Sequence, residues 1–200
     1  MLLAFIAPNN FSWPIEAVKC WFKLPKYDII WAEGPDLDFN RNMIWRQALN
    51  LQVRKPSHLL TIDTDIVFKP EDVFKIEEHL NNGLDAVTGI YPVGQPPYPP
   101  CIFERIPGDY KLTTPKEGLN EIGACGAGFM GINKNVILNM GKDPFDNIRE
   151  GEVFHGEDIS FCHRLREKGY KLWSDNSIQL GHIRNKVIYQ DLTSRDESNY

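Results

Sequence analysis

The sequence predicts a single α/β domain with a mostly parallel central sheet, flanked by helices and accompanied by a small antiparallel second sheet. Strand-like and helix-like segments alternate through the first ninety residues, which implies parallel strands joined by right-handed crossovers. Short strand-like runs follow residue 100, where this alternation stops. The chain has 200 residues, enough to bury one substantial core, so we expect residues 1–200 to form one domain.

Four strands and three helices are expected in the first half of the chain. Apolar and β-branched runs predict the strands, and apolar residues at helical spacing predict the helices. The predicted strands are Leu2–Ala7, Tyr27–Ala32, Leu59–Ile62 and Ala86–Ile90, and the predicted helices are 12–24, Phe39–Leu51 and Glu71–Asn82. Ser12 is a suitable N-terminal cap for the first helix, and Gly83 is a suitable stop for the third.

The segment YPVGQPPYPP at 91–100 breaks the alternation, because its five prolines exclude a central strand and stiffen a loop. Two interpretations remain open for it. It is a plain connector, or it is a wall at the carboxyl edge of the sheet that offers Tyr91 and Tyr98 to a ligand. The remaining predicted elements are strands at Cys101–Arg105, Tyr110–Thr113, Leu119–Ile122, Lys171–Ser174 and Ile178–His182, and a helix at Glu157–Lys168.

Composition and charge narrow the class of protein. The net charge is −5 and the chain has no block of Lys or Arg, which argues against nucleic-acid binding. The apolar start MLLAFIAP lacks a basic region and ends at Pro8, so we expect a strand there, not a signal peptide or transmembrane segment. The scattered cysteines predict core thiols of a reducing compartment, and hence a cytoplasmic protein; they are Cys20, Cys101, Cys125 and Cys162.

Two aspartates, Asp63 and Asp65, follow the predicted strand in HLLTIDTDIVFKP. Residues i and i+2 of a strand project to the same side, so the two carboxylates are expected to converge. Their repulsion is relieved if a cation lies between them, and oxygen ligands at this edge of a parallel sheet favour Mg²⁺ or Mn²⁺. The alternative is a strand-ending turn with two solvated aspartates.

The stretch GAGFMG at 126–131 matches the pattern GxGxxG, but it does not open a helix. A dinucleotide fingerprint needs a strand before the glycines and a helix within them. Here Phe129 to Ile132 continue as a strand-like run, far from the N-terminal βαβ segment. We expect these small residues to allow close approach of a sugar or of neighbouring backbone.

Two further groups of residues indicate chemistry in the second half. Glu157 and Asp158 lie in the first turn of a predicted helix, where negative charge is favoured electrostatically; Asp158 is also placed to act as a general base. His182 follows a short strand, and the cations after it, Arg184 and Lys186, suit phosphate oxygens. A hydrogen-bonded structural histidine is the alternative.

Four stretches, in this order, resemble motifs of the GT-A glycosyltransferases, and in particular of soluble family-2-like members. FNRNMIWRQAL is similar to the helix before their DxD strand, TIDTD to the DxD strand end, GEDISFCHRLREKGYKLW to their ED-x5-R segment, and GH at 181–182 to their late histidine. The resemblance covers about Leu3 to Lys186. It implies one GT-A (Rossmann-like) domain with a nucleotide-binding half at about 1–100 and an acceptor-binding half at about 101–190.

The resemblance also implies a role for each matching residue. Asp65 and His182 would be ligands of Mn²⁺ or Mg²⁺, and Asp63 would contact the metal through water or the ribose. Asp158, with Glu157 beside it, would be the catalytic base that deprotonates the acceptor hydroxyl in inverting members. The residues implied to bind the nucleotide donor are Pro8, Glu33, Arg41, Asp63, Thr64 and Lys186.

The implied reaction is transfer of a sugar from a nucleotide-diphosphate sugar, with UDP favoured, to a glycan or another hydroxyl acceptor. One departure concerns the base contacts: the acidic pair that usually follows the second strand is AEGPD here, with Glu33 as its substitute. Two other functions stay open. DTDIV also fits the nucleophile motif of haloacid-dehalogenase-type phosphatases, with Asp63 as nucleophile, although a βαβα unit precedes it. The chain could also be a nucleotide-sugar-binding module without catalysis.

Overall fold

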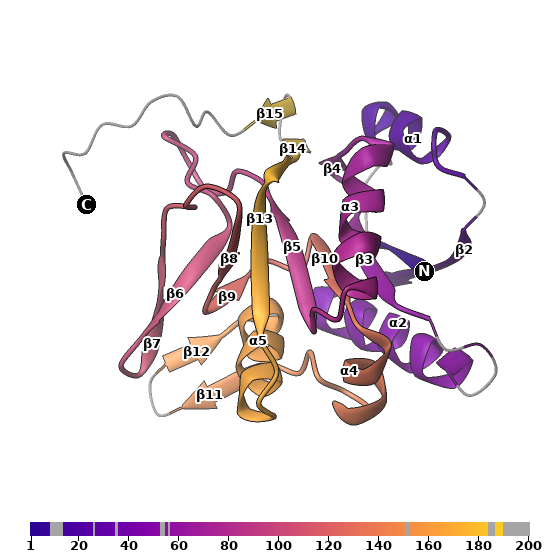
Figure 1. Ribbon diagram of the computed structural model, residues 1–200. Coiled ribbons are helices and arrows are strands. Elements are labelled where there is room, and N and C mark those ends of the chain that lie inside the picture. The colour runs from indigo at the N-terminus through magenta and orange to yellow at the C-terminus, as the bar shows by residue number, and fades with distance from the viewer. Residues whose placement is uncertain are drawn as a thin grey trace.

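A computed structural model describes the protein at residues 1–8, 14–25, 27–34, 36–52, 55, 57–150, 153–183 and 187–189 (Figure 1). Within these residues the predicted fold class is confirmed. The chain is α/β, with a large, mostly parallel central sheet, helices on both of its faces and small antiparallel sheets. The predicted alternation of strands and helices holds to residue 90, apart from one inserted two-residue strand.

Seven strands form the central sheet, and five of them run in the same direction. They are β1 (Leu2–Pro8), β2 (Asp28–Gly34), β3 (Leu59–Asp63), β5 (Ala86–Ile90), β8 (Leu119–Glu121), β10 (Phe129–Ile132) and β13 (Leu172–Gln179), in the order β2-β1-β3-β10-β5-β13-β8. β1 is parallel to β2 and β3, and β5 is parallel to β13. The two reversed strands are β10, between β3 and β5, and β8, at the edge beside β13.

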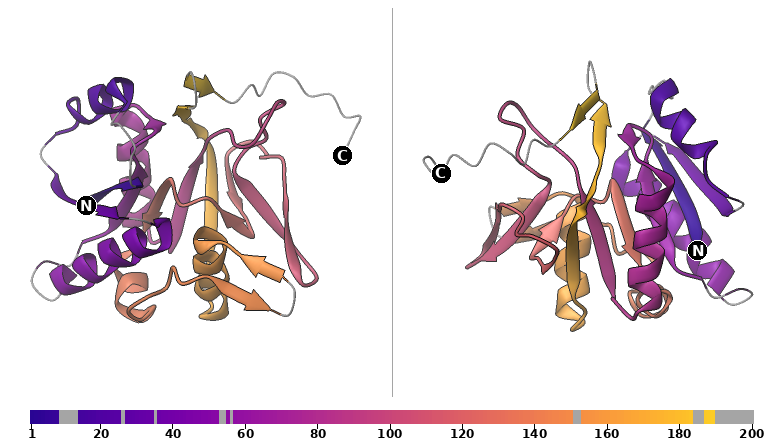
Figure 2. Two further views of the ribbon diagram at one scale, coloured as in Figure 1. Left: turned by 180° about the vertical axis from the view of Figure 1, so that it is seen from behind. Right: turned by 45° about the horizontal axis from the view of Figure 1, so that its top comes forward.

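Helices cover both faces of this sheet. The described helices are α1 (Ile15–Trp21), α2 (Leu37–Gln52), α3 (Pro70–Asn81), α4 (Lys134–Asn139) and α5 (Glu157–Glu167). Alternate residues of β1 enter two different cores, as the strand period of two requires. Leu2 and Ile6 belong to the core with α2, α4 and α5, whereas Leu3 and Phe5 belong to the core with α1 and α3. Figure 2 shows α2 and α5 on one face and α3 on the other.

Three small antiparallel sheets, rather than the single one predicted, surround the central sheet. One contains β4 (Ile66–Val67), β14 (Gly181–Ile183) and β15 (Val187–Tyr189). Another contains β6 (Ile102–Ile106), β7 (Asp109–Leu112) and β9 (Ala124–Cys125), and the third is the hairpin of β11 (Ile148–Glu150) and β12 (Val153–His155). The first of these sheets carries His182 toward the end of β3, because β14 pairs with β4.

Several boundaries differ from the sequence predictions. The strands predicted at Lys171–Ser174 and Ile178–His182 are one long strand, β13, whose pairing with β5 shifts register after Ser174, followed by β14. Helix α4 and the β11–β12 hairpin were not predicted. The proposed cap Ser12 lies outside the described residues, and Pro14 holds the N-cap position of α1.

The small residues of GAGFMG pack against large neighbours, and the segment leads into β10, as expected. A Cβ added to Gly126 would overlap the hydroxyl of Tyr91, and one added to Gly131 would overlap Ile76 of α3. Larger residues would therefore push α3 or Tyr91 away from the sheet. These glycines allow side chains to approach the backbone closely.

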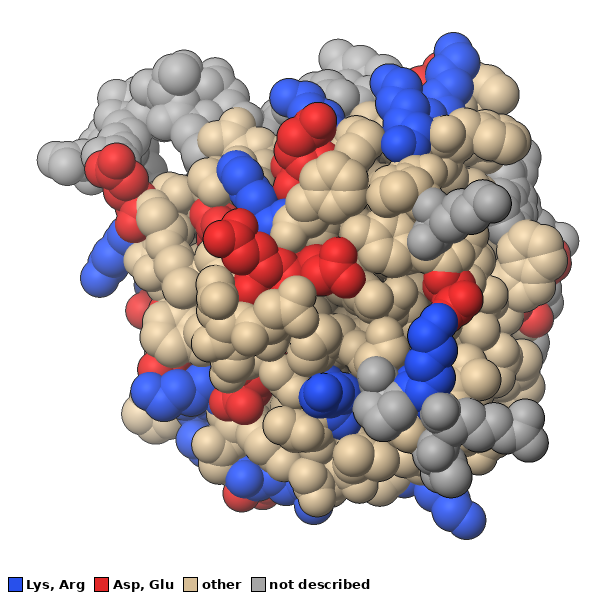
Figure 3. Space-filling model, turned by 45° about the vertical axis from the view of Figure 1, so that its right-hand side comes forward, with Lys and Arg blue, Asp and Glu red and all other residues tan. Residues whose placement is uncertain are grey.

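The described helices include none that is both long and apolar enough to cross a lipid bilayer. The face in Figure 3 intersperses acidic and basic side chains among uncharged ones, without an extended basic surface on that face. All four cysteines are buried free thiols, as predicted.

Candidate functional site

The predicted site residues lie around the carboxyl end of β3 and the first turn of α5, the edge at which open α/β sheets bind ligands. Asp63 is the last residue of β3, and Thr64 and Asp65 form the turn that leads to β4. Glu157 and Asp158 occupy the first turn of α5, directly after the N-cap residue of that helix. The structure therefore brings together residues that are about ninety positions apart in the sequence.

Arg41 of α2 joins the two parts of this site. Its side chain is 3% exposed, and Nη1 and Nη2 each donate to one oxygen of Asp63 at 3.0 Å. Its Nε also donates to Oε1 of Glu157 at 3.3 Å. Burial opposes the charge of Arg41, but the carboxylates of Asp63 and Glu157 outweigh burial and raise the pKa of Arg41. One guanidinium thus offsets two carboxylates from β3 and α5.

Asp158 stands beside this ion-pair network with a perturbed acidity. Burial raises the pKa of Asp158 to about 6; the Glu157 carboxylate adds to the rise and Arg41 opposes it. The Oδ1 atom of Asp158 accepts a hydrogen bond from the backbone N–H of Ile159 at 2.7 Å, which fixes the orientation of the carboxyl group. A carboxyl group with a pKa close to neutral can take a proton and release it at physiological pH.

Asp65 and His182 form a second pair at the same end of β3. Nε2 of His182 lies 3.1 Å from Oδ2 of Asp65, and Nδ1 lies 2.8 Å from the carbonyl oxygen of Pro92. Since a carbonyl can only accept, Nδ1 carries a hydrogen. In a neutral imidazole Nε2 then carries a lone pair, which faces an oxygen of the Asp65 carboxylate. Two lone pairs repel each other, so a proton or a metal ion must lie between these atoms.

The residues at this position fit a divalent cation. A histidine whose Nδ1–H is held by a backbone carbonyl has the orientation usual for metal-bound imidazole. Two ligands at right angles around Mg²⁺, each about 2.1 Å away, are about 3 Å apart, close to the observed separation between Asp65 and His182. The hydroxyl of Thr64, between the two aspartates, is buried and has no hydrogen-bond partner among the described residues. Mg²⁺ is commonly held by few protein ligands together with substrate phosphates.

Among the described residues Asp63 and Asp65 pair with different cations, Arg41 and His182, although the Asp65 carboxylate is near enough to add to the raised pKa of Asp63, which is caused mainly by burial. Asp63 pairs with Arg41, and the described residues contain no group of three His, Cys, Asp or Glu side chains placed to hold a metal. The reason is local: Asp65 lies beyond the last residue of β3, so the alternation of strand side chains no longer applies to it. Because both oxygens of Asp63 accept hydrogen bonds, a nucleophilic role of the phosphatase type is disfavoured.

The other predicted donor-binding residues lie at different distances from this centre. Pro8 ends β1 opposite Gly34 of β2, and Glu33 is exposed on β2, one residue before Gly34. The backbone N–H of Thr64 donates to the carbonyl oxygen of Ile6 in β1. The pairing of β3 with β1 therefore continues one residue past the end of β3. Lys186 lies outside the described residues. Arg164, the arginine of the ED-x5-R segment, donates to the backbone carbonyls of Pro144 and Asp146.

The loop at 91–100 contributes one tyrosine to the interior. Tyr91 is 5% exposed, and its hydroxyl accepts a hydrogen bond from the backbone N–H of Gly128 at 3.1 Å. Pro92 supplies the carbonyl that holds His182. The first two residues of the loop therefore hold Gly128 and His182 by hydrogen bonds. Tyr98, further along the loop, is partly exposed and has φ 55°.

Sequence reasoning missed Asn40, although the neighbouring Arg41 was selected. Asn40 is fully buried, and its Nδ2 donates to the carbonyls of Ala7 and Gly34 at 3.2 and 3.3 Å. It therefore ties together the carboxyl ends of β1 and β2, where Pro8 and Glu33 lie. An asparagine beside the arginine was visible in FNRN, but only the packing of α2 on the sheet reveals this contact.

No family model matches the chain. Among solved structures it is similar to A197 from STIV, with a TM-score of 0.69 and 18% identity, covering 100% of both chains. It is also similar to a nucleoside-diphosphate-sugar pyrophosphorylase from Vibrio cholerae RC9, with a TM-score of 0.52 and 13% identity over 94% of this chain and 76% of the other. These likenesses show the fold alone: the chain shares its α/β fold with both proteins, the second of which is a nucleotide-sugar enzyme.

A curated relative matches a shorter stretch. An alignment of 60 residues is 35% identical to procollagen-lysine,2-oxoglutarate 5-dioxygenase 1 of Gallus gallus. This alignment covers 28% of this chain and 8% of that protein. The chain thus corresponds to a small fraction of that relative, and the match carries no activity over to it.

Proposed function

We propose that this protein transfers a sugar from a nucleotide-diphosphate sugar to an acceptor hydroxyl, with inversion, and that Asp158 is the base. The fold and the arrangement of polar groups at one sheet edge support this function. The observation that carries it is the Asp65–His182 pair, with Nδ1 of His182 held by Pro92 and Nε2 facing the carboxylate. Such a pair suits a divalent cation that arrives with a diphosphate.

In the proposed reaction the acceptor oxygen attacks the anomeric carbon, and its proton passes to a carboxylate oxygen of Asp158. The bond from that carbon to the diphosphate breaks, and its electron pair leaves with the phosphate oxygen. Mg²⁺ or Mn²⁺ held by Asp65 and His182 would stabilise the negative charge on the leaving diphosphate. Arg41 holds Asp63 and Glu157 in place, which keeps the donor side of the site rigid.

Asp158 suits the role of base because its pKa lies near 6. It is ionised at neutral pH, so it can accept a proton, and it is more basic than an ordinary aspartate. A positioned base of this kind contributes about 10²–10⁴-fold to a rate. Glu157 is held by Arg41, so its role is to position the start of α5 and to raise the pKa of Asp158.

In this proposal residues of about 1–100 bind the nucleotide-sugar donor, and residues of about 101–190 bind the acceptor.

A melting-temperature screen tests the donor, with UDP-glucose, UDP-galactose, UDP-N-acetylglucosamine and GDP-mannose, each with and without Mn²⁺. A ligand that binds the folded state at about 100 times its Kd adds about 2.7 kcal/mol of stability. We expect a rise in Tm for at least one UDP-sugar, and only with Mn²⁺. The proposal fails if no nucleotide sugar raises the Tm under either condition.

Turnover separates an enzyme from a binding module. Release of UDP from the donor that binds, with water or a sugar as acceptor, would indicate catalysis. Binding of that donor without any UDP release would favour a nucleotide-sugar-binding module. Release of phosphate from p-nitrophenyl phosphate with Mg²⁺ would instead favour a phosphatase.

A further inference from the structure

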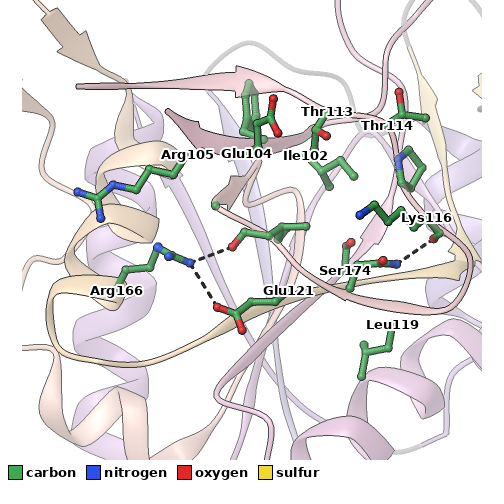
Figure 4. Close-up of a pocket in the computed structure, with 15 residues that line it drawn as sticks. Ile102, Glu104, Arg105, Thr113, Thr114, Lys116, Leu119, Glu121, Arg166 and Ser174 are labelled. Atoms are coloured by element: carbon green, nitrogen blue, oxygen red, sulfur yellow. Dashed lines mark hydrogen bonds and ion pairs between the residues drawn. The ribbon is translucent and has the colours of Figure 1, made fainter. Parts of the chain in front are cut away.

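A pocket lies on the opposite side of β5 and β13 from β1 and β3. Its volume is ≈ 590 Å³, and it is lined by residues of β6, the segment 113–116, β8 and Ser174 of β13. Arg166, in the last turn of α5, closes one end. Figure 4 shows Arg166 at one side of the pocket and Thr114 and Lys116 at the other. Its size is that of a site for a small organic ligand.

Two buried polar atoms in the wall of this pocket have no hydrogen-bond partner among the described residues. They are Oγ of Ser174, a residue that is fully buried, and Nε of Arg166. Leaving such a group unsatisfied costs about 1–3 kcal/mol, and most buried polar groups are paired. Figure 4 draws Arg166 and Ser174 on opposite sides of the pocket, so each atom would take a separate hydrogen bond from an extended ligand with several polar groups.

The charges around the pocket favour an uncharged ligand. The lining carries both signs, from Glu104, Arg105, Lys116, Glu121 and Arg166. Glu121 lies 3.9 Å from Arg166 and 3.0 Å from Lys171, which lies outside the lining, so the charge of Arg166 is already countered. The three cations of the lining exceed its two carboxylates by one, but Figure 4 draws Arg105 and Arg166 at one side and Lys116 at the other. The positive charge is therefore not directed at one point, as a phosphate or carboxylate site would need.

The remaining lining combines short polar groups with apolar ones. Thr113, Thr114 and Asn120 supply hydroxyl and amide groups, whereas Phe103 and Leu119 supply apolar surface. Sugars have the same character, because hydroxyls at their edges alternate with apolar C–H faces. From the unsatisfied Ser174 and Arg166 atoms and this lining, we propose that the pocket binds a carbohydrate chain.

The position of the pocket relative to Asp158 indicates an extended ligand. Arg166 follows Asp158 by eight residues of α5, which corresponds to about 12 Å along the helix axis. A monosaccharide at Asp158 would not reach the pocket, but an oligosaccharide could occupy both. The identification of this carbohydrate with the acceptor rests on the proposed function; the binding of a carbohydrate here does not.

Methyl-detected NMR of the full chain tests the binding directly. Maltotriose, cellotriose, chitotriose and mannotriose are titrated separately, without nucleotide and without metal. We expect at least one of them to shift the methyl resonances of Ile102, Leu119 and Ile122, which line the pocket. The methyl of Ile44, in the core beneath α2, should not shift. Inorganic phosphate and citrate serve as anionic probes.

Two variants locate the ligand. Ser174→Ala removes an unpartnered hydroxyl, so we expect an unchanged or higher Tm and about 3- to 10-fold weaker binding. Leu119→Trp fills the pocket and should abolish the shifts. Ser160→Ala is the matched control, because the fully buried Ser160 hydroxyl accepts from Ile148 and donates to His155. That substitution should lower the Tm.

Three outcomes would overturn the proposal. No trisaccharide shifts the pocket methyls; or the shifts persist unchanged in both Ser174→Ala and Leu119→Trp; or phosphate or citrate shifts these methyls while the trisaccharides do not. Repeating the titration with Asp158→Asn separates this proposal from the proposed function. Binding to the pocket should survive in that variant whether or not the protein transfers sugar.

Discussion

Arg41 and Asp63 form a two-pronged ion pair, with Nη1 and Nη2 of the arginine each 3.0 Å from a different oxygen of the aspartate. The pair joins α2 to the end of β3, and the arginine also reaches Glu157 in α5. A planar guanidinium can meet these acceptors together, whereas an ammonium group offers no such fork. The relative placement of three elements at the site therefore depends on one side chain.

Replacement of Arg41 should destabilise the protein strongly. Arg41→Ala leaves two partly buried carboxylates uncompensated, and breaking a buried pair in this way costs about 3–5 kcal/mol. Arg41→Lys keeps the charge but loses hydrogen bonds to Asp63 or Glu157, so we expect a loss of about 1–3 kcal/mol. Urea unfolding at constant m-value measures both changes.

Arg46 provides the matched control for this prediction. It lies in the same helix as Arg41 and pairs with Asp143, but its side chain is 54% exposed. Exposed ion pairs contribute about 0–1 kcal/mol, so Arg46→Lys should change the unfolding free energy little. Equal effects of Arg41→Lys and Arg46→Lys would contradict the role assigned to the buried pair.

Mn²⁺ should bind through Asp65 and His182. Addition of Mn²⁺ together with UDP should raise the Tm of the native protein, and the free Mn²⁺ signal in electron paramagnetic resonance should fall. His182→Gln and Asp65→Asn should each remove both effects. His79 and Asp175 form a similar pair away from the site, with Nε2 and Oδ2 2.8 Å apart, so His79→Gln should leave both effects intact.

The opposite result would assign a proton to the Asp65–His182 pair. If Mn²⁺ and UDP leave the Tm of the native protein and the resonance signal unchanged, the histidine is the charged partner of a structural ion pair. Its ring ¹⁵N shifts would then show two bound protons near neutral pH. Such a finding would remove the metal from the proposed function.

The fold was predictable because its signals are local. Period-two and helical patterns identify the strands and helices up to residue 90, and alternation of the two implies a parallel sheet. The insertion of β10 between β3 and β5, in the opposite direction, has no such local signal. α4 and the β11–β12 hairpin are short elements that tertiary packing stabilises, and patterns in a few residues do not identify them.

The sequence was enough to select residues for the candidate site. It was not enough to tell which of them form ion pairs or hydrogen bonds with one another. Asp63, Asp65, Glu157, Asp158 and His182 were selected from sequence, and all lie around the end of β3 and the start of α5 or on β14 beside them. Which carboxylate meets which cation depends on where β3 ends and on how α2 packs. Those are long-range properties, so the different partners of Asp63 and Asp65 could not be read from spacing.

Tyr91 should matter for stability and Tyr98 should not. Tyr91→Phe leaves the buried N–H of Gly128 without its acceptor, which costs about 1–3 kcal/mol. Tyr98→Phe alters a partly exposed side chain and should change the unfolding free energy by less than about 0.5 kcal/mol. Thermal unfolding of both variants measures the difference. A lower Tm for Tyr91→Phe alone would show that the first residue of the 91–100 loop stabilises the fold, and equal Tm values would contradict this role.

Asp158 should set the acid limb of the activity profile. The pKa of Asp158 is raised to about 6, and a base must be ionised, so kcat/KM should rise with pH up to about 6 and then level off. Asp158→Asn should lower kcat by about 10²–10⁴-fold while leaving donor affinity in place. An active Asp158→Asn protein would refute the assignment of the base.

The same substitution should stabilise the folded protein, and the gain should depend on pH. The pKa of Asp158 is raised from 3.8 in the unfolded chain to about 6, so between these values the folded state binds more protons. The contribution of Asp158 to stability therefore falls as pH rises through this window, by at most about 3 kcal/mol. Asp158→Asn removes this loss, because asparagine stays neutral and can still accept from Ile159.

We therefore expect Asp158→Asn to raise the Tm at pH 7.5 and to leave it nearly unchanged below about pH 4. Asp38 is the matched control, because it also lies in a first helical turn and its Oδ1 accepts from the next backbone N–H at 2.8 Å. Asp38→Asn removes a charge that a helix N-terminus favours, so it should lower stability by about 0.3–1 kcal/mol at pH 7.5. A gain for Asp158→Asn that is the same at both pH values would show that the buried charge is not its cause.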